Sequence, residues 1–222
     1  MTKPFSVLVA ISIIAFARIP SVTCQTDQVS RGTWGAFARS LSSQDGSPSS
    51  LGVVSPNGVL VITEAADGVR FVDPKGSTTL LDDVPSGSPL TEVLWSPTSK
   101  SFAVTASDGG LVGTWDAFAY SIDGNQHLAV HNIRDVIASS IVGFPQCLTP
   151  EKAGVAAVTW LKDGAELLVV SEVPPHSSCR NMGAIRGFLI SAKDWRILEQ
   201  IPAGTLRSAW RTDLGARLLN SR

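Results

Sequence analysis

Apolar stretches separated by short turns recur along this chain in a pattern that occurs four times. The clearest copies read GVVSPNGVLVIT (52–63), EVLWSPTSKSFAVT (92–105) and AVTWLKDGAELLVV (157–170), and a weaker copy reads RSAWRTDLGARLLN (207–220). In each copy a polar turn joins two apolar stretches, which predicts a hairpin of two strands. A tryptophan precedes the turn in three of the four copies.

Further turn signals extend three of these hairpins to four strands each. Asn57-Gly58 and Asp67-Gly68 are tight-turn dipeptides, because both residue types tolerate positive φ. The first unit has predicted strands at 51–54, 59–63, 69–72 and 78–81. The second has strands at about 91–95, 101–106, 111–122 and 126–131, and the third at 155–161, 165–171, 184–191 and 195–201. Four antiparallel strands with tight turns are typical of one propeller blade.

The two ends of the chain predict a further, shared blade. GTWGAFARSL (32–41) matches GTWDAFAYSI (113–122) at seven of ten positions, which predicts a strand at 32–41. Residues 206–211 and 216–219 are predicted as two more strands. We therefore expect an all-β fold, a small or incomplete β-propeller of about four blades whose N- and C-terminal strands share one blade. An open stack of sheets, or a piece of a longer array, is the alternative.

One insertion, at about 132–152, interrupts the strands. Ile133, Val136, Ile137 and Ile141 lie three to four residues apart, which is helical spacing. Asn132 is a suitable N-cap. The sequence thus predicts one short helix, which ends near Gly143.

The first 24 residues have the pattern of a secretory signal peptide. Lys3 precedes an apolar run from Phe5 to Ala17, and small residues follow it. The remaining domain is 25–222, and the expected location is secreted or periplasmic. The only membrane attachment that we expect is through the N-terminus, either as an uncleaved anchor or as a lipid on Cys24.

Cleavage after Cys24 leaves two cysteines, Cys147 and Cys179. An even pair in an exported chain predicts a disulfide, and this one joins the insertion to a second long loop at 172–183. Two reduced, buried thiols are the alternative.

The segment VLWSPTSKSFAVTASDGG resembles a propeller repeat of the TolB-like and WD-repeat kind. Trp95, Ser96, Pro97 and Lys100 match the apolar–Trp–Ser–Pro–Asp–Gly–Lys–apolar string of such repeats, whereas Thr98 and Ser99 replace Asp-Gly. The resemblance implies a blade and a modular binding surface. It implies no activity, since such folds include hydrolases, lyases, receptors and scaffolds.

Composition and charge narrow the function classes. Hydrophobic residues make up 44% and charged residues 17%, as in a packed globular protein. The net charge of −1 becomes −3 without Lys3 and Arg18, so we expect no nucleic-acid partner.

His127 and His131 lie about 13 Å apart on an extended strand and lack a third ligand. Since nucleophile and phosphate-binding motifs are missing too, the sequence predicts no catalytic residues, no metal and no cofactor.

The resulting hypothesis is an exported binding or scaffold protein. We expect a protein partner, with self-association into a larger propeller as a further option. The predicted contact surface is a rim formed by the insertion and the 172–183 loop, with His176, Arg180 and Asn181 as candidate residues. The alternative is an envelope enzyme, a hydrolase or lyase, whose groups gather at the mouth of the ring.

Overall fold

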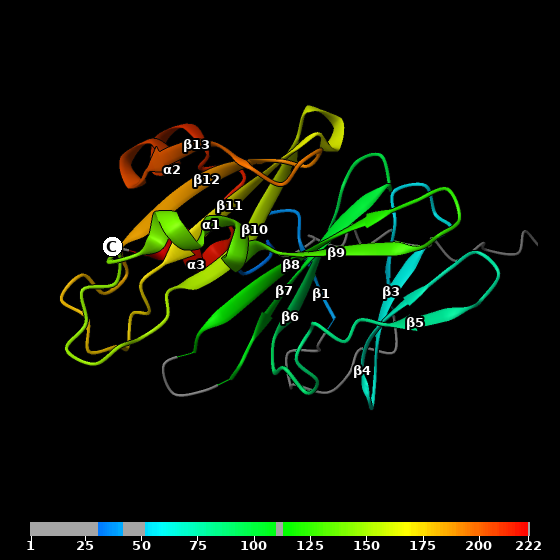
Figure 1. Ribbon diagram of the computed structural model, residues 1–222, viewed down its shortest axis with the longest axis horizontal. Helices are drawn as coiled ribbons and strands as arrows, with labels where there is room; N and C mark the ends of the chain where they lie inside the picture. Colours follow the sequence, from blue (N-terminus) through cyan, green and yellow to red (C-terminus); the bar gives the residue numbers. More distant parts are fainter. Residues whose placement is uncertain (1–30, 42–51, 110–112, 222) are drawn as a thin grey trace, which may run out of the picture. The chain divides into compact units, whose positions relative to one another are not determined.

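The computed structural model describes residues 31–41, 52–109 and 113–221. The predicted signal peptide lies outside the described residues and stays a prediction. The described part is mostly β, with three antiparallel sheets and few helices, as expected (Figure 1).

Each of the three predicted four-stranded units forms a sheet whose strands follow the chain order. The first sheet consists of β2 (Val53–Val54), β3 (Val61–Ala65), β4 (Gly68–Val72) and β5 (Thr78–Leu80). The second contains β6 (Thr91–Trp95), β7 (Ser101–Ser107), β8 (Trp115–Ile122) and β9 (Leu128–Asn132), and β1 (Arg39–Ser40) adds a fifth strand beside β6. The third consists of β10 (Gly154–Leu161), β11 (Glu166–Glu172), β12 (Ile185–Ser191) and β13 (Ile197–Pro202). A 3-10 turn, Lys162–Gly164, joins β10 to β11.

Apolar side chains fill the seams between successive sheets. The seam between the first and second sheets holds a row of aromatic rings, in which Phe102 lies 6.1 Å from Phe71 and 4.8 Å from Tyr120 by ring centroids. The seam between the second and third sheets contains Ala103, Val155 and other fully buried side chains. Burial of this much apolar surface is the main stabilising contribution to the fold.

The repeated tryptophans make the same contact in both seams. Trp95, at the end of β6, donates its indole N–H to the carbonyl oxygen of Val53 on β2 over 3.2 Å. Trp160, on β10, donates its indole N–H to the carbonyl oxygen of Leu94 on β6 over 3.0 Å. Each bond joins the first meander strand of one sheet to the first of the preceding sheet. The sequence repeat is therefore also a repeat of inter-sheet contacts.

The predicted helical insertion is confirmed. Helix α1 (Ile133–Ile141) begins after Asn132, whose side chain accepts a hydrogen bond from the backbone N–H of Arg134. Ile133 and Ile137 are fully buried against the second and third sheets. The helical spacing seen in the sequence is thus the spacing of the buried face.

The predicted strands at 206–211 and 216–219 are wrong. These residues form helix α2 (Ala203–Ala209) and helix α3 (Ala216–Asn220). Leu206, Leu214 and Leu218 are buried on the outer face of the third sheet, against residues such as Val158 and Leu168. Leu206 lies in α2 and Leu218 in α3, whereas Leu214 precedes α3, and the two helices cover a sheet face that would otherwise be exposed.

The predicted blade shared by the two chain ends is therefore also wrong. Within 32–41 only β1 (Arg39–Ser40) is a strand, and it pairs with β6 as a fifth strand of the second sheet. Gly35 approaches β10 so closely that a Cβ on it would lie 2.4 Å from the carbonyl oxygen of Val158, so only glycine fits at this position. The described residues thus contain three sheets and no fourth one.

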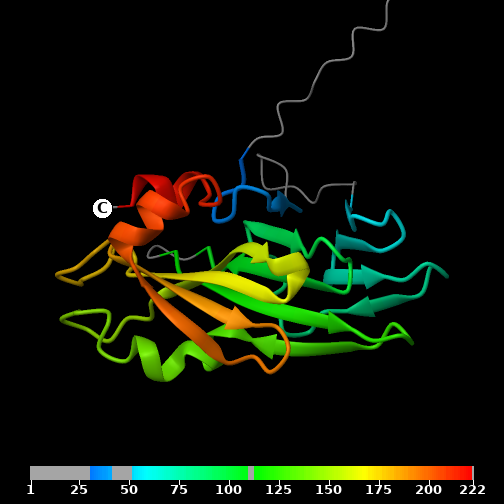
Figure 2. The same cartoon turned by 90° about the horizontal axis from the view of Figure 1, so that it is seen from above.

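The two ends of the described chain nevertheless meet (Figure 2). Gly35 forms an isolated antiparallel bridge with Leu214. The carbonyl oxygens of residues 32–34 accept hydrogen bonds from the backbone N–H groups of residues 215–217, at the start of α3. Segment 31–41 thereby satisfies helix N–H groups that have no partner within the helix.

A buried carboxylate accepts hydrogen bonds from backbone N–H groups of the same segment, 31–41. Glu92, on β6 and 3% exposed, accepts backbone N–H groups from Thr33 at 2.5 Å and from Trp34 at 3.2 Å. Burial raises the pKa of Glu92 above its ordinary value of 4.5, although both hydrogen bonds oppose the rise.

We expect this raised pKa to make stability pH-dependent. The folded protein holds the Glu92 proton more tightly than the unfolded chain does. Its free energy of unfolding should therefore fall, relative to that of a Glu92→Gln variant, as the pH rises from about 4.5 through the raised pKa, with a slope of at most about 1.4 kcal/mol per pH unit. Urea unfolding of both proteins between pH 4 and 8 measures the difference. The exposed Glu199→Gln variant is the control, and a difference that stays constant with pH would contradict the prediction.

Candidate functional site

The disulfide Cys147–Cys179 is present, as predicted. It joins the loop after α1 to the loop between β11 and β12. Backbone hydrogen bonds flank it on both sides, from Arg180 N–H to the carbonyl oxygen of Gln146 at 2.8 Å and from Leu148 N–H to that of Ser178 at 3.5 Å. We call these two loops, residues 142–153 and 173–184, the disulfide rim. A disulfide is typical of proteins that fold in oxidising compartments.

Asn181 fastens the two loops of the disulfide rim to each other. Its side-chain amide donates to the carbonyl oxygen of Phe144 over 2.7 Å and accepts the backbone N–H of Gln146 over 2.9 Å. Ser178 donates its hydroxyl and its backbone N–H to Glu151, and these bonds hold the pKa of that carboxyl below its usual value. The rim is thus held by side-chain contacts as well as by its covalent bridge.

Two arginines attach the rim and α1 to the sheets. Arg134 is ion-paired with Asp116 of β8 and donates to the carbonyl oxygens of Ala153 and Trp115 at 2.8 and 3.2 Å. Arg186, on β12, donates to the carbonyl oxygen of Ser140 at 3.0 Å, near the end of α1. Functional loops are commonly positioned by a rigid scaffold in this way.

The rim exposes large apolar side chains beside a cavity. Val142 is 82% exposed and Leu148 is 80% exposed. Both line a cavity of about 500 Å³ between α1 and the loop after it, together with Ile141, Pro145 and Pro150. The lining also contains two charges of each sign, from Arg134, Asp135, Glu151 and Lys152. Apolar area with a polar border is typical of surfaces that bind other proteins.

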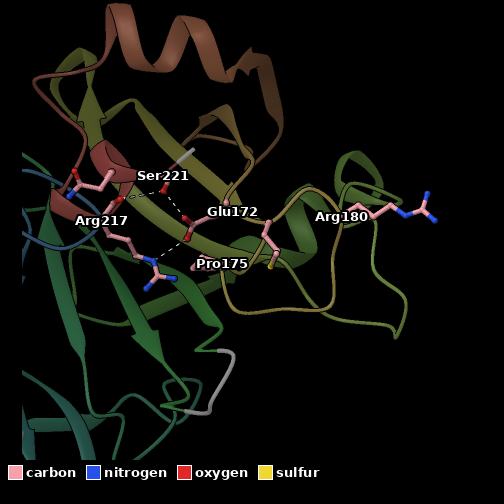
Figure 3. Close-up of a pocket in the computed structure, with 8 residues that line it drawn as sticks. Glu172, Pro175, Arg180, Arg217 and Ser221 are labelled. Carbon is pink, nitrogen blue, oxygen red and sulfur yellow. Dashed lines mark hydrogen bonds and ion pairs between the residues drawn. The ribbon is translucent and has the colours of Figure 1, made fainter.

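A second cavity, of about 510 Å³, lies on the other side of the β11–β12 loop (Figure 3). Glu172, the last residue of β11, lies in its wall with a side chain only 2% exposed. The carboxylate accepts Arg217 Nε over 3.0 Å and the Ser221 hydroxyl over 2.6 Å. The Arg217 guanidinium carbon also lies 4.0 Å from the centroid of the Trp115 ring.

The three predicted rim residues lie in different environments. Arg180 is exposed and lines the second cavity. His176 is exposed in the same loop, and Asn181 is occupied by the contacts that join the loops. None of these placements tests whether the residues bind a partner, so their role stays a prediction.

Sequence reasoning missed the group of Glu172, Arg217 and Ser221. Two signals were available in the sequence. Glu172 ends the apolar stretch Leu167–Val170 with a charge, and Trp115 belongs to the GTW motif that occurs twice. Arg217 was assigned to a strand instead of α3, which concealed its proximity to both.

The two histidines that the sequence analysis did not assign to a metal site, His127 and His131, have different partners in the structure. His127 Nδ1 lies 3.1 Å from Asp123 Oδ2 in a turn, whereas His131 stacks on Trp195 with ring centroids 4.3 Å apart. Across residues 31–41, 52–109 and 113–221, no three His, Cys, Asp or Glu side chains are grouped so as to hold a metal ion. In the same ranges, none of the helices has the length and apolar character required to cross a membrane.

Comparison of the chain with known protein families gives no match to any family's sequence model, and no curated protein matches its sequence.

Proposed function

We propose that this chain is an exported binding protein that contacts a protein partner through the disulfide rim. The exposure of Val142 and Leu148 carries the proposal, because large apolar side chains on a rigid loop gain free energy when a partner covers them. The loops are fixed before binding by the bridge and by Asn181, so little conformational entropy is lost on association.

The three sheets are, in this proposal, blades of an incomplete β-propeller. Two observations support it: the meander order of each sheet, and the indole-to-carbonyl bond that recurs between the first meander strands of neighbouring sheets. The position that Trp95 occupies in the second copy is Val54 in the first copy, and Val54 is 53% exposed. The first sheet thus lacks the tryptophan that would reach a preceding blade.

Export is the second part of the proposal. It rests on the N-terminal sequence pattern and on the Cys147–Cys179 bridge. N-terminal sequencing of the protein recovered from outside the cytoplasm tests it. A mature protein that begins after Cys24 supports the proposal, and a full-length protein retained in the cytoplasm contradicts it.

Site-specific photo-crosslinking tests the partner surface. A photoreactive residue at Leu148 should give a discrete crosslinked protein in the native compartment, and a Val142→Asp substitution should reduce that product at least tenfold. The control position is Leu198, which is 43% exposed on β13, away from the disulfide rim. Equal products at both positions, or a product at Leu148 that Val142→Asp does not change, would contradict a specific interface.

A further inference from the structure

The cavity beside Glu172 contains Arg217, whose guanidinium is held in place through one of its three nitrogens. Among the described residues, the Arg217 guanidinium has one hydrogen-bond partner, the Glu172 carboxylate, through Nε. Its two terminal nitrogens, Nη1 and Nη2, make no hydrogen bond within that part of the chain. Figure 3 shows the guanidinium lying beside Glu172 on the cavity side of α3.

Two contacts fix the orientation of this guanidinium. The ion pair with Glu172 holds Nε at 3.0 Å, and the Trp115 ring lies 4.0 Å from the guanidinium carbon. The Ser221 hydroxyl satisfies the other carboxylate oxygen. Because the arginine is already ordered, a ligand that binds Nη1 and Nη2 loses little free energy in ordering it.

The other lining residues define the chemistry that fits. Arg180 also belongs to the lining, but in Figure 3 its guanidinium points away from Arg217 and Glu172. Arg217 and Glu172 form a neutral pair, so the hydrogen-bond donors that this site offers to an anion are the two terminal nitrogens of Arg217. Pro175 and Met182 supply apolar surface.

We propose that this cavity binds a small organic anion whose carboxylate or phosphate group pairs with Arg217 and whose apolar body contacts Pro175 and Met182. The paired terminal nitrogens of a guanidinium match two oxygens of such a group. The cavity volume of about 510 Å³ is in the range of small-molecule sites. This site is separate from the apolar surface around Val142 and Leu148, and it does not depend on the binding of a protein partner there.

Calorimetric titration of the full chain with three matched probes tests the proposal. The probes are hexanoate, hexyl phosphate and 1-hexanol, which share an apolar chain and differ in the head group. At least one anion should bind tenfold or more tightly than the alcohol. Preference for hexanoate identifies a carboxylate site, preference for hexyl phosphate a phosphate site, and similar affinity for both a general oxyanion site. Equal affinity for the alcohol and both anions, or no binding of either anion, would overturn the proposal.

Variants test which residue binds. Arg217→Met is combined with Glu172→Gln, so that no buried carboxylate loses its partner, and this pair should weaken anion binding at least tenfold. Arg180→Met, whose guanidinium points away from Arg217, and Arg196→Met, on an exposed turn beside β13, should each change it by less than twofold. If the double variant does not fold, the NMR signal of the Trp115 indole N–H in the unmodified protein is the second measurement. It should shift with the anion and not with 1-hexanol, and an unchanged signal would overturn the proposal.

Discussion

Replacing Trp160 with alanine is expected to lower the free energy of unfolding by about 3–5 kcal/mol. The Trp160 side chain is 7% exposed, lies in the seam between the second and third sheets, and donates its indole N–H to Leu94. The substitution removes the ring from the seam and also removes the hydrogen bond to the Leu94 carbonyl oxygen, and both losses destabilise the folded state. Urea unfolding followed by circular dichroism measures the change.

Two further variants separate these contributions. Trp160→Phe keeps an aromatic ring but loses the indole N–H, so it should cost less than Trp160→Ala, about 1–3 kcal/mol. Leu198→Ala, at a position that is 43% exposed on β13, should stay within about 0.5 kcal/mol of the unmodified protein. A loss below about 1 kcal/mol for Trp160→Ala would show that the seam is not packed as described.

Removal of the disulfide should lower the free energy of unfolding by about 2–4 kcal/mol. The bridge joins residues 32 apart in the sequence, so it restricts the unfolded chain considerably. Asn181 and the backbone bonds between the loops remain in the folded state. The rim should therefore keep its arrangement, and most of the loss should arise from the greater entropy of the unfolded chain.

The comparison is made in a Cys24→Ala background, with and without Cys147→Ala and Cys179→Ala. Addition of a reducing agent should lower the stability of the bridged protein to that of the variant without the bridge, and should leave the variant unchanged. Equal stability of the two oxidised proteins would mean that the bridge does not restrict the unfolded chain.

The three sheets and α1 were predictable because their signals are local. Turn pairs such as Asn57-Gly58 and Asp67-Gly68 set the hairpins, and the spacing of Ile133 and Ile137 set the helix. The Cys147–Cys179 pairing followed from the count of cysteines. The sheets and α1 depend on residues that are close in the sequence. The disulfide could be predicted because two cysteines allow only one pairing.

The chain ends were not predictable in the same way. Trp34 and Trp115 lie in nearly identical sequences, yet Trp115 begins β8 whereas Trp34 lies just before β1, held by Glu92. Residues 207–220 resemble the other hairpins, but the exposed face of the third sheet selects helices there. In both cases distant contacts override the local pattern.

The second cavity could not be predicted from the sequence, because residues from distant segments of the chain form it. Glu172, Arg217 and Trp115 come from β11, α3 and β8, and only the packing of α3 brings them together. No spacing in the chain relates these residues. The disulfide rim, in contrast, was expected as a surface, although the structure shows that Asn181 holds the loops together and that Val142 and Leu148 provide the exposed apolar area.

The most direct test of this account is the nuclear Overhauser spectrum of the tryptophan indole protons. Contacts are expected from the Trp95 indole N–H to protons around Val53 and from the Trp160 indole N–H to protons around Leu94, one in each seam. Indole protons of Trp95 and Trp160 that show contacts only within their own sheets would contradict the stacking of the three sheets.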